Sequence, residues 1–220
     1  MTHEFKTPIS TIKISAEVFL NNESIKKDKR LARYANIILE QSQRLNDQVE
    51  KVLQVAKLEK NTVELDSRII NLHNLLESVV ESFELRIHEL NGKIDLKLNV
   101  ENPSIQADSL HLINVLNSLI DNAIKYSKDA PSITVLTCED NHFIYLKVQD
   151  LGIGIAKEDQ NKIFQKFYRV PTGDIHDVKG FGLGLFYVQS ICKAHGWALN
   201  VQSEKGKGTT FTISFKKQHQ

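Results

Sequence analysis

Three short stretches carry glycines, or carboxylate, amide and ammonium side chains, in patterns that could bind a ligand. They read SLIDNAIKYS at 118–127, DLGIGI at 150–155 and GFGLGL at 180–185. In GFGLGL, glycine lets the backbone come close to an anion, and the free amides at the start of the helix that follows point toward it. This is the chemistry of a phosphate cradle. On its own the pattern is more often a tight turn, so its interpretation depends on the other two stretches.

The other two stretches add contacts for a purine and for a metal ion. Asp150 ends a strand-like stretch, and Gly152 and Gly154 let a flat ring lie against the backbone, which suits the exocyclic amine of adenine. Asn122 offers a neutral oxygen to a Mg²⁺ that bridges phosphates, and Lys125 lies on the same helix face. The alternatives are a capped turn for Asp150 and a solvated helix face for Asn122 and Lys125. The three stretches together favour an adenine nucleotide.

Two helices are predicted ahead of these stretches, over residues 1–60. Apolar residues follow helical spacing from Phe5 to Phe19, with His3 on the opposite side. The second helix runs to about residue 60 and carries two heptad rows, which are Leu31, Ile38, Leu45 and Val52, and Ala35, Ser42, Val49 and Ala56. Two helices joined by a short turn cannot cover both apolar faces. We therefore expect a helical hairpin that pairs with a second copy into a four-helix bundle.

Pro8 lies within the helical spacing of the first helix. A proline inside a helix has no N–H to donate and presses on the carbonyl four residues earlier, which predicts a bend one turn after His3. The alternative is a helix that begins near Lys6, with Pro8 in its first turn, where proline is tolerated.

The periodicity changes after about residue 61. Alternating stretches typical of strands lie at 93–100, 132–138, 142–150, 198–203 and 209–215, and helical stretches lie near 72–90, 109–126 and 183–195. The stretches joined by residues 139–141 form a predicted hairpin, so the sheet should be mixed. The predicted fold class is α+β: the helical hairpin, then an α/β sandwich over 61–220 with a mixed sheet packed on helices.

Composition narrows the function classes. The 220 residues hold 28 Lys and Arg against 27 Asp and Glu, so the net charge of +1 gives no field that favours nucleic acid. Cys138 and Cys192 form no CxxC pair, which argues against a disulfide or zinc scaffold. No apolar run approaches the roughly 20 residues that cross a bilayer.

Five motifs in this order resemble those of sensor histidine kinases. HEFKTP at 3–8 resembles the phosphoacceptor box, and SLIDNAIKYS resembles the asparagine box. DLGIGI and GFGLGL resemble the two glycine boxes, and IFQKFYR at 163–169 the phenylalanine box. The resemblance covers nearly the whole chain. It implies a dimerisation and histidine-phosphotransfer domain over 1–60, followed by an ATP-binding domain of the type shared with gyrase, Hsp90 and MutL over 61–220.

The resemblance also implies roles for single residues. His3 would be phosphorylated, Glu4 would orient it or act as base, and Thr7 would position the water that dephosphorylates a response regulator. Asn122 would hold Mg²⁺ and Asp150 would read adenine. The remaining nucleotide contacts would be the side chains of Lys125, Tyr126 and Arg169 and the amides around Gly180, Gly182, Leu183 and Gly184. Residues 168–181 would form a mobile lid, and a flexible junction is expected near 57–64.

One position departs from the family pattern. The family commonly has an asparagine four residues before the magnesium asparagine, but here that position is Ser118, with Asn117 one place earlier. One residue turns a side chain by about 100° on a helix, so Asn117 cannot substitute directly. Water molecules would then supply more of the ligands of the metal ion. In hydrolytic relatives this position carries a glutamate that activates water, and serine cannot act as that base.

The function implied is the cytoplasmic catalytic core of a dimeric sensor histidine kinase. It would phosphorylate His3 from Mg-ATP and pass the phosphoryl group to an aspartate of a response regulator, with a bacterial inner-membrane anchor upstream of Met1. One alternative is a hydrolysing ATPase of the same fold, which Ser118 and the HEFKTP box disfavour. The other is a module that binds nucleotide or a partner without chemistry.

Overall fold

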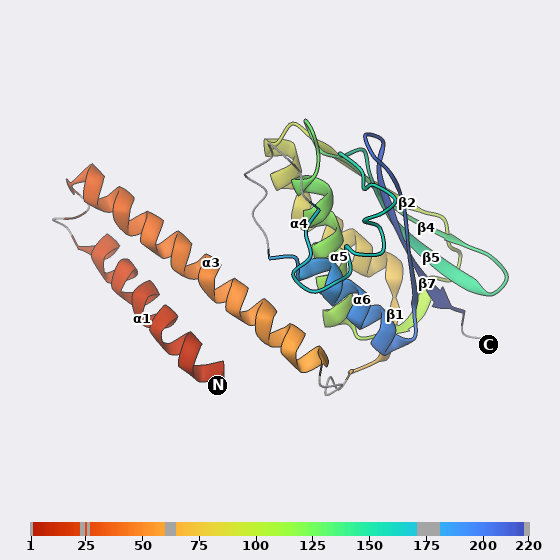
Figure 1. The fold of residues 1–220 in the computed structure, drawn as a ribbon, viewed down its shortest axis with the longest axis horizontal. Helices are drawn as coiled ribbons and strands as arrows, with labels where there is room; N and C mark the ends of the chain where they lie inside the picture. Colours follow the sequence, from red (N-terminus) through yellow and green to blue (C-terminus); the bar gives the residue numbers. More distant parts are fainter. Residues whose placement is uncertain (1, 23–24, 26, 60–64, 171–180, 218–220) are drawn as a thin grey trace. The chain divides into compact units, whose positions relative to one another are not determined.

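The computed structural model describes the chain except for residues 1, 23–24, 26, 60–64, 171–180 and 218–220 (Figure 1). Some side chains of the first two helices, including those of residues 2–7, also lie outside the description. The chain divides into two compact units, Met1–Val63 and Glu64–Gln220. The predicted class, a helical hairpin followed by a mixed-sheet α+β unit, is confirmed.

The first unit is an antiparallel pair of helices, α1 (Thr2–Asn21) and α3 (Lys29–Glu59) (Figure 1). Asp28 begins α3, since its Oδ1 accepts the N–H groups of Arg30 and Leu31 at 2.8 and 3.2 Å. Among the described side chains of these two helices, the buried ones are Ile9, Ala16, Ala35 and Ser42. Three of these four have small side chains, which allows the two helix backbones to approach closely.

Pro8 lies inside α1, which begins at Thr2. The alternative in which Pro8 occupies the first turn of a helix starting near Lys6 is therefore wrong. The helix lacks one backbone hydrogen bond here, because Pro8 has no N–H to offer the carbonyl of Glu4.

One heptad row of α3 is exposed within the single chain. Leu31, Ile38, Leu45 and Val52 have exposed fractions of 48, 43, 45 and 44%. In the companion row Ala35 and Ser42 are buried and Val49 is half-buried, whereas the side chain of Ala56 lies outside the described residues. The hairpin thus covers one of its two apolar faces and leaves the other without a cover.

The second unit contains a five-stranded sheet in the order β2-β4-β5-β7-β6. The strands are β2 (Lys93–Leu98), β4 (Ser132–Glu139), β5 (Phe143–Asp150), β6 (Ala198–Glu204) and β7 (Gly208–Lys216). β2 and β4 are parallel and the other neighbours are antiparallel. The predicted hairpin of β4 and β5 and the mixed sheet are confirmed.

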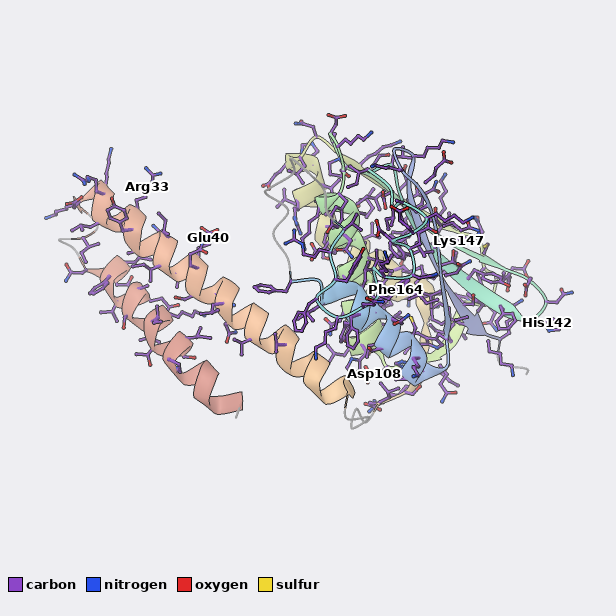
Figure 2. All side chains as sticks on the ribbon, in the orientation of Figure 1. Arg33, Glu40, Asp108, His142, Lys147 and Phe164 are labelled. Carbon is purple, nitrogen blue, oxygen red and sulfur yellow. The ribbon has the colours of Figure 1, made fainter. Side chains whose placement is uncertain are left out.

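Three helices cover one face of this sheet, namely α4 (Leu72–Glu89), α5 (Ser109–Lys125) and α6 (Gly184–His195) (Figure 1). Asn71 caps α4. Asp108, which is labelled in Figure 2, caps α5 by accepting the His111 N–H at 3.1 Å. The core lies between helices and sheet; its largest fully buried side chains include Leu72, Leu76, Leu112, Leu116, Ile120, Ile133, Leu146 and Phe215. Burial of each is worth about 1.5–3 kcal/mol relative to exposure.

Two short strands were not predicted. β1 (Arg68–Asn71) and β3 (Ser104–Ala107) pair antiparallel beside α4 and α5. Each has only four residues, which is too short for alternation to stand out from a loop, and each finds its partner more than 30 residues away. No described helix is both long and apolar enough to cross a membrane.

Candidate nucleotide-binding site

The end of α5 and the loop after β5 meet through their backbones. The Ile153 N–H donates to the carbonyl of Tyr126 at 2.9 Å. A Cβ atom at Gly152 would collide with that same carbonyl. The sequence-predicted residues Asn122, Tyr126 and Gly152 are therefore brought together, because only glycine allows this approach.

The turn that leads into α6 also lies against α5, at Ser118, about one helical turn before Asn122. A Cβ placed on Gly184 would lie 3.9 Å from the Cβ of Ser118. Ser118 thus points toward the start of α6, and Asn117 is rotated away from that direction by about 100°. The asparagine box, the first glycine box and the start of α6 lie around one place in the fold.

Asp150 is nearly buried at the end of β5, with 9% of its surface exposed. Burial raises the pKa of its carboxyl group, and this is opposed by hydrogen bonds from the backbone N–H groups of Gly152 and Thr209. The Gly152 N–H lies 2.8 Å from Oδ1. These donors keep a buried acceptor in a fixed orientation, which suits an amine donor on a bound base.

The loop that carries Gly154 is held against the turn between β6 and β7. Gly154 has φ +65°, and a Cβ there would collide with the carbonyl of Glu204. The Gly206 N–H donates to the Ile153 carbonyl at 2.7 Å, and the Ile155 N–H donates to Ser203 Oγ at 2.8 Å. The loop is therefore a rigid wall of the site.

The start of α6 has the features of an anion cradle. Gly182 has φ +68°, and its carbonyl accepts the Phe167 N–H at 3.1 Å. Leu183 occupies the N-cap position and makes no side-chain capping bond to the first turn. The amides of this turn are oriented for a negatively charged group, as is general at helix N-termini. Gly180 lies outside the described residues.

The remaining side chains predicted to contact the nucleotide differ in exposure. Asn122 and Tyr126 are half-buried, whereas Lys125 and Arg169 are exposed. Asp121, which precedes Asn122, is instead paired with Arg86 of α4 at 2.6 Å and so belongs to the packing of the two helices. No group of three His, Cys, Asp or Glu is placed to hold a metal ion among the described residues. An amide oxygen from Asn122 is a ligand type that Mg²⁺ accepts.

The residues predicted to take part in phosphotransfer lie in the first unit. His3, Glu4 and Thr7 belong to the first two turns of α1, and their side chains lie outside the described residues. The lid predicted over 168–181 is likewise mostly outside the description, since it contains 171–180. The junction predicted near 57–64 begins within α3, which continues to Glu59, and its residues 60–64 are not described.

The structure adds residues that sequence reasoning missed. Ser203 and Thr209 touch the glycine loop and Asp150, and Gln160 donates to the carbonyl of Ser203 at 2.7 Å. Serine, threonine and glutamine are common on any surface, so nothing in their types pointed to the site. The pairing of β6 with β7 brings Ser203 and Thr209 there, and Gln160 reaches Ser203 from the turns that follow the glycine loop.

Comparison with known proteins agrees with this geometry. Residues 107–219 match the family of histidine kinase-, DNA gyrase B- and HSP90-like ATPases, and residues 1–61 match the His Kinase A phospho-acceptor domain. The chain therefore belongs to the histidine kinase-, gyrase- and HSP90-like ATPase family. Its two domains together are those of a sensor histidine kinase.

Similar proteins align with nearly the whole chain. The chain is 41% identical over 216 residues to the sensor protein RprX of Bacteroides fragilis (strain YCH46), covering 97% of this chain and 42% of RprX. It is 31% identical over 221 residues to the sensor protein SrrB of Staphylococcus aureus (strain NCTC 8325 / PS 47), covering 99% of this chain and 37% of SrrB. The crystal structure of full-length ShkA in complex with AMPPNP superposes with a TM-score of 0.87 at 26% identity, over 99% of this chain and 45% of that one. The chain thus spans less than half the length of these relatives.

The raised pKa of Asp150 leads to a titration experiment. In the free protein, the Asp150 carboxyl carbon should titrate by NMR above the ordinary aspartate value of 3.8, because burial disfavours the charge. An adenine nucleotide that binds the ionised carboxylate should lower this pKa, since binding stabilises the charged form.

Asp140 provides the control for this titration. The Tyr145 hydroxyl and the backbone N–H groups of His142 and Phe143 lower the pKa of Asp140 to about 2. It lies at the opposite end of β5, so nucleotide should leave its titration unchanged. An Asp150 pKa that rises on nucleotide binding would contradict the acceptor role.

Proposed function

We propose that this chain is the catalytic core of a two-component sensor histidine kinase, with residues 1–60 as the dimerisation and phosphotransfer domain and 61–220 as the ATP-binding domain. It transfers the γ-phosphoryl group of Mg-ATP to His3 and from there to an aspartate of a response regulator. The main support is the meeting of the α5 end, Asp150 and the glycine turn before α6 around one place, in a chain that also carries the phospho-acceptor domain.

Each part of ATP has a candidate partner in the second unit. The Asp150 carboxylate accepts from the adenine amine, and Gly152 and Gly154 allow the loop beside it to pack against the backbone of Tyr126 and Glu204. The remaining phosphate and nucleoside contacts are assigned to Lys125, Tyr126, Arg169, Gly180, Gly182, Leu183 and Gly184. Asn122 holds Mg²⁺, which neutralises phosphate charge when bound.

The chemistry at His3 is a direct transfer to nitrogen. One imidazole nitrogen attacks the γ-phosphorus as the bond to the ADP oxygen breaks, and the other nitrogen carries the ring proton. Glu4, next in the chain, orients that proton or accepts it as the ring becomes cationic. Thr7, one turn further on, positions water for dephosphorylation of the regulator. The protein's main tasks are in-line positioning and charge neutralisation.

Homodimerisation is supported by the exposed heptad row of α3. Four large apolar side chains at seven-residue spacing, Leu31, Ile38, Leu45 and Val52, are uncovered within one chain. A second copy of the hairpin would bury them in a four-helix bundle. The membrane anchor and the sensor are assigned to parts of the protein beyond these residues.

Labelling with γ-³²P-ATP tests the kinase function. Wild-type protein should acquire label that is stable in base and labile in acid, as a phosphorylated imidazole is, and His3→Ala should lose it. Asn122→Ala should lower the labelling rate by about 100-fold, because the metal would lose its protein ligand. Thr7→Ala should keep the label and lose regulator dephosphorylation.

The same experiment separates the alternatives. Release of free phosphate without labelled protein would support a hydrolysing ATPase. Nucleotide binding with neither label nor phosphate would support a module without chemistry. Either outcome would overturn the proposal.

Substitution in the exposed row tests the dimer. Ile38→Glu combined with Leu45→Glu should convert a dimer to a monomer in sedimentation experiments at micromolar concentration, because charges would enter the bundle core. The matched control is Ile14→Glu, since Ile14 is 57% exposed but lies on the His3 side of α1. It should leave the dimer intact. A double variant that sediments as wild type would contradict the assigned interface.

A further inference from the structure

Three residues form a row across the sheet beside the base-binding end. Asp150 of β5 is directly opposite Thr209 of β7, and Thr209 is directly opposite Ser203 of β6. Directly opposed residues in antiparallel strands point to the same face of the sheet. Asp150 and Thr209 are buried at 9% and 6% exposure, so this is the face covered by the helices.

The Ser203 hydroxyl makes three polar contacts. Its Oγ lies 2.8 Å from the Ile155 N–H donor, 2.8 Å from the Gly208 carbonyl and 2.9 Å from Thr209 Oγ1. Its backbone is also held, since Gln160 Nε2 donates to the Ser203 carbonyl at 2.7 Å. Ser203 therefore has a fixed position and a fixed set of partners.

Counting protons assigns the direction of each bond. A hydroxyl has one proton and two lone pairs, and a carbonyl can only accept. The Ser203 proton must therefore lie toward the Gly208 carbonyl, and both lone pairs accept, one from Ile155 and one from Thr209. The Thr209 hydroxyl group consequently donates its proton to Ser203 Oγ. Toward any other neighbour, Thr209 Oγ1 can act only as an acceptor.

We propose that Ser203 determines base specificity by fixing the Thr209 hydroxyl as an acceptor next to Asp150. This inference rests on the proposed nucleotide site. The row then presents two acceptors, the Asp150 carboxylate and Thr209 Oγ1, to the base. Adenine offers an exocyclic amine, which donates, whereas guanine has a carbonyl oxygen at the equivalent position, which accepts. Two acceptors facing that carbonyl leave it unpaired, so the site selects adenine.

Ser203 acts through Thr209, and Ser203 is therefore a positioning residue. In Ser203→Ala the Thr209 hydroxyl is free to turn its proton toward the base and donate to a carbonyl. The ratio of the Kd for GTP to the Kd for ATP should fall by about ten-fold, mainly through tighter GTP binding. Ser203→Thr keeps the hydroxyl and should keep the wild-type ratio.

The control variant is Gln160→Ala. It removes the hydrogen bonds from Gln160 to the carbonyls of Ser203 and Ile155. The hydrogen bond from the Thr209 hydroxyl group to Ser203 Oγ stays in place. It should weaken ATP and GTP equally, with the ratio unchanged. Thr209→Val is the second variant: it removes the acceptor, lowers the ratio by itself, and in its background Ser203→Ala should have no further effect.

Calorimetric titration of each nucleotide, with a thermal melt of each variant, gives a clear result. If wild-type protein binds neither nucleotide, the proposed function fails. If wild-type protein prefers ATP and Ser203→Ala keeps the ratio, or weakens both nucleotides equally, the inference is overturned while the function stands. If Ser203→Ala does not fold, an unchanged ratio in Thr209→Val overturns the inference in the same way.

Discussion

The hydrogen bond from the Ile153 N–H to the Tyr126 carbonyl is the contact on which the candidate site depends. It joins the C-terminal end of α5 to the loop after β5. Asn122 lies one helical turn before Tyr126, and Asp150 lies three residues before Ile153, so this bond fixes the separation of the proposed metal and adenine residues. Any side chain at Gly152 would collide with the same carbonyl and force the two elements apart.

The sheet positions further residues next to Asp150, on the strands β7 and β6. Pairing of β5 with β7 and of β7 with β6 aligns Asp150, Thr209 and Ser203 on one face. A slip of one residue in either register would turn one member of the row to the opposite face of the sheet. The acceptor set offered to a base is therefore a property of strand register as much as of residue type.

Local signals explain what could be predicted from the sequence. The helices α4, α5 and α6 begin and end within one residue of the predicted stretches, because apolar periodicity and the caps Asn71 and Asp108 are encoded nearby. Asp150 and Gly152 also stood out, because they occur in one chain with the asparagine stretch at 118–127 and the glycine stretch at 180–185. Ser203 did not stand out, because its role exists only once two strands are paired. The same limit applies to β1 and β3, whose pairing is between distant residues.

The apolar pattern of α3 illustrates a different limit. The heptad rows predicted that the hairpin needs a further partner, and in the structure one row faces α1 while the other remains exposed. The apolar periodicity of a helix indicates that one of its faces is covered in the folded protein. It does not tell whether the covering helix belongs to the same chain or to another chain. The small residues Ala35 and Ser42 are the ones that pack within the hairpin, and the large residues are left for a partner.

Ser118 connects the geometry of the site to the choice of phosphoryl acceptor. Its Cβ faces Gly184 at the turn proposed for the phosphates, so a base at this position would be well placed to activate water. A serine hydroxyl does not titrate near neutral pH and cannot serve as that base. An imidazole supplies its own lone pair, and the residue assigned to its ring proton is Glu4, so no base is needed at Ser118. On the proposed function, the second unit therefore has only to hold the nucleotide and exclude an activated water, and the nucleophile comes from α1 of the first unit.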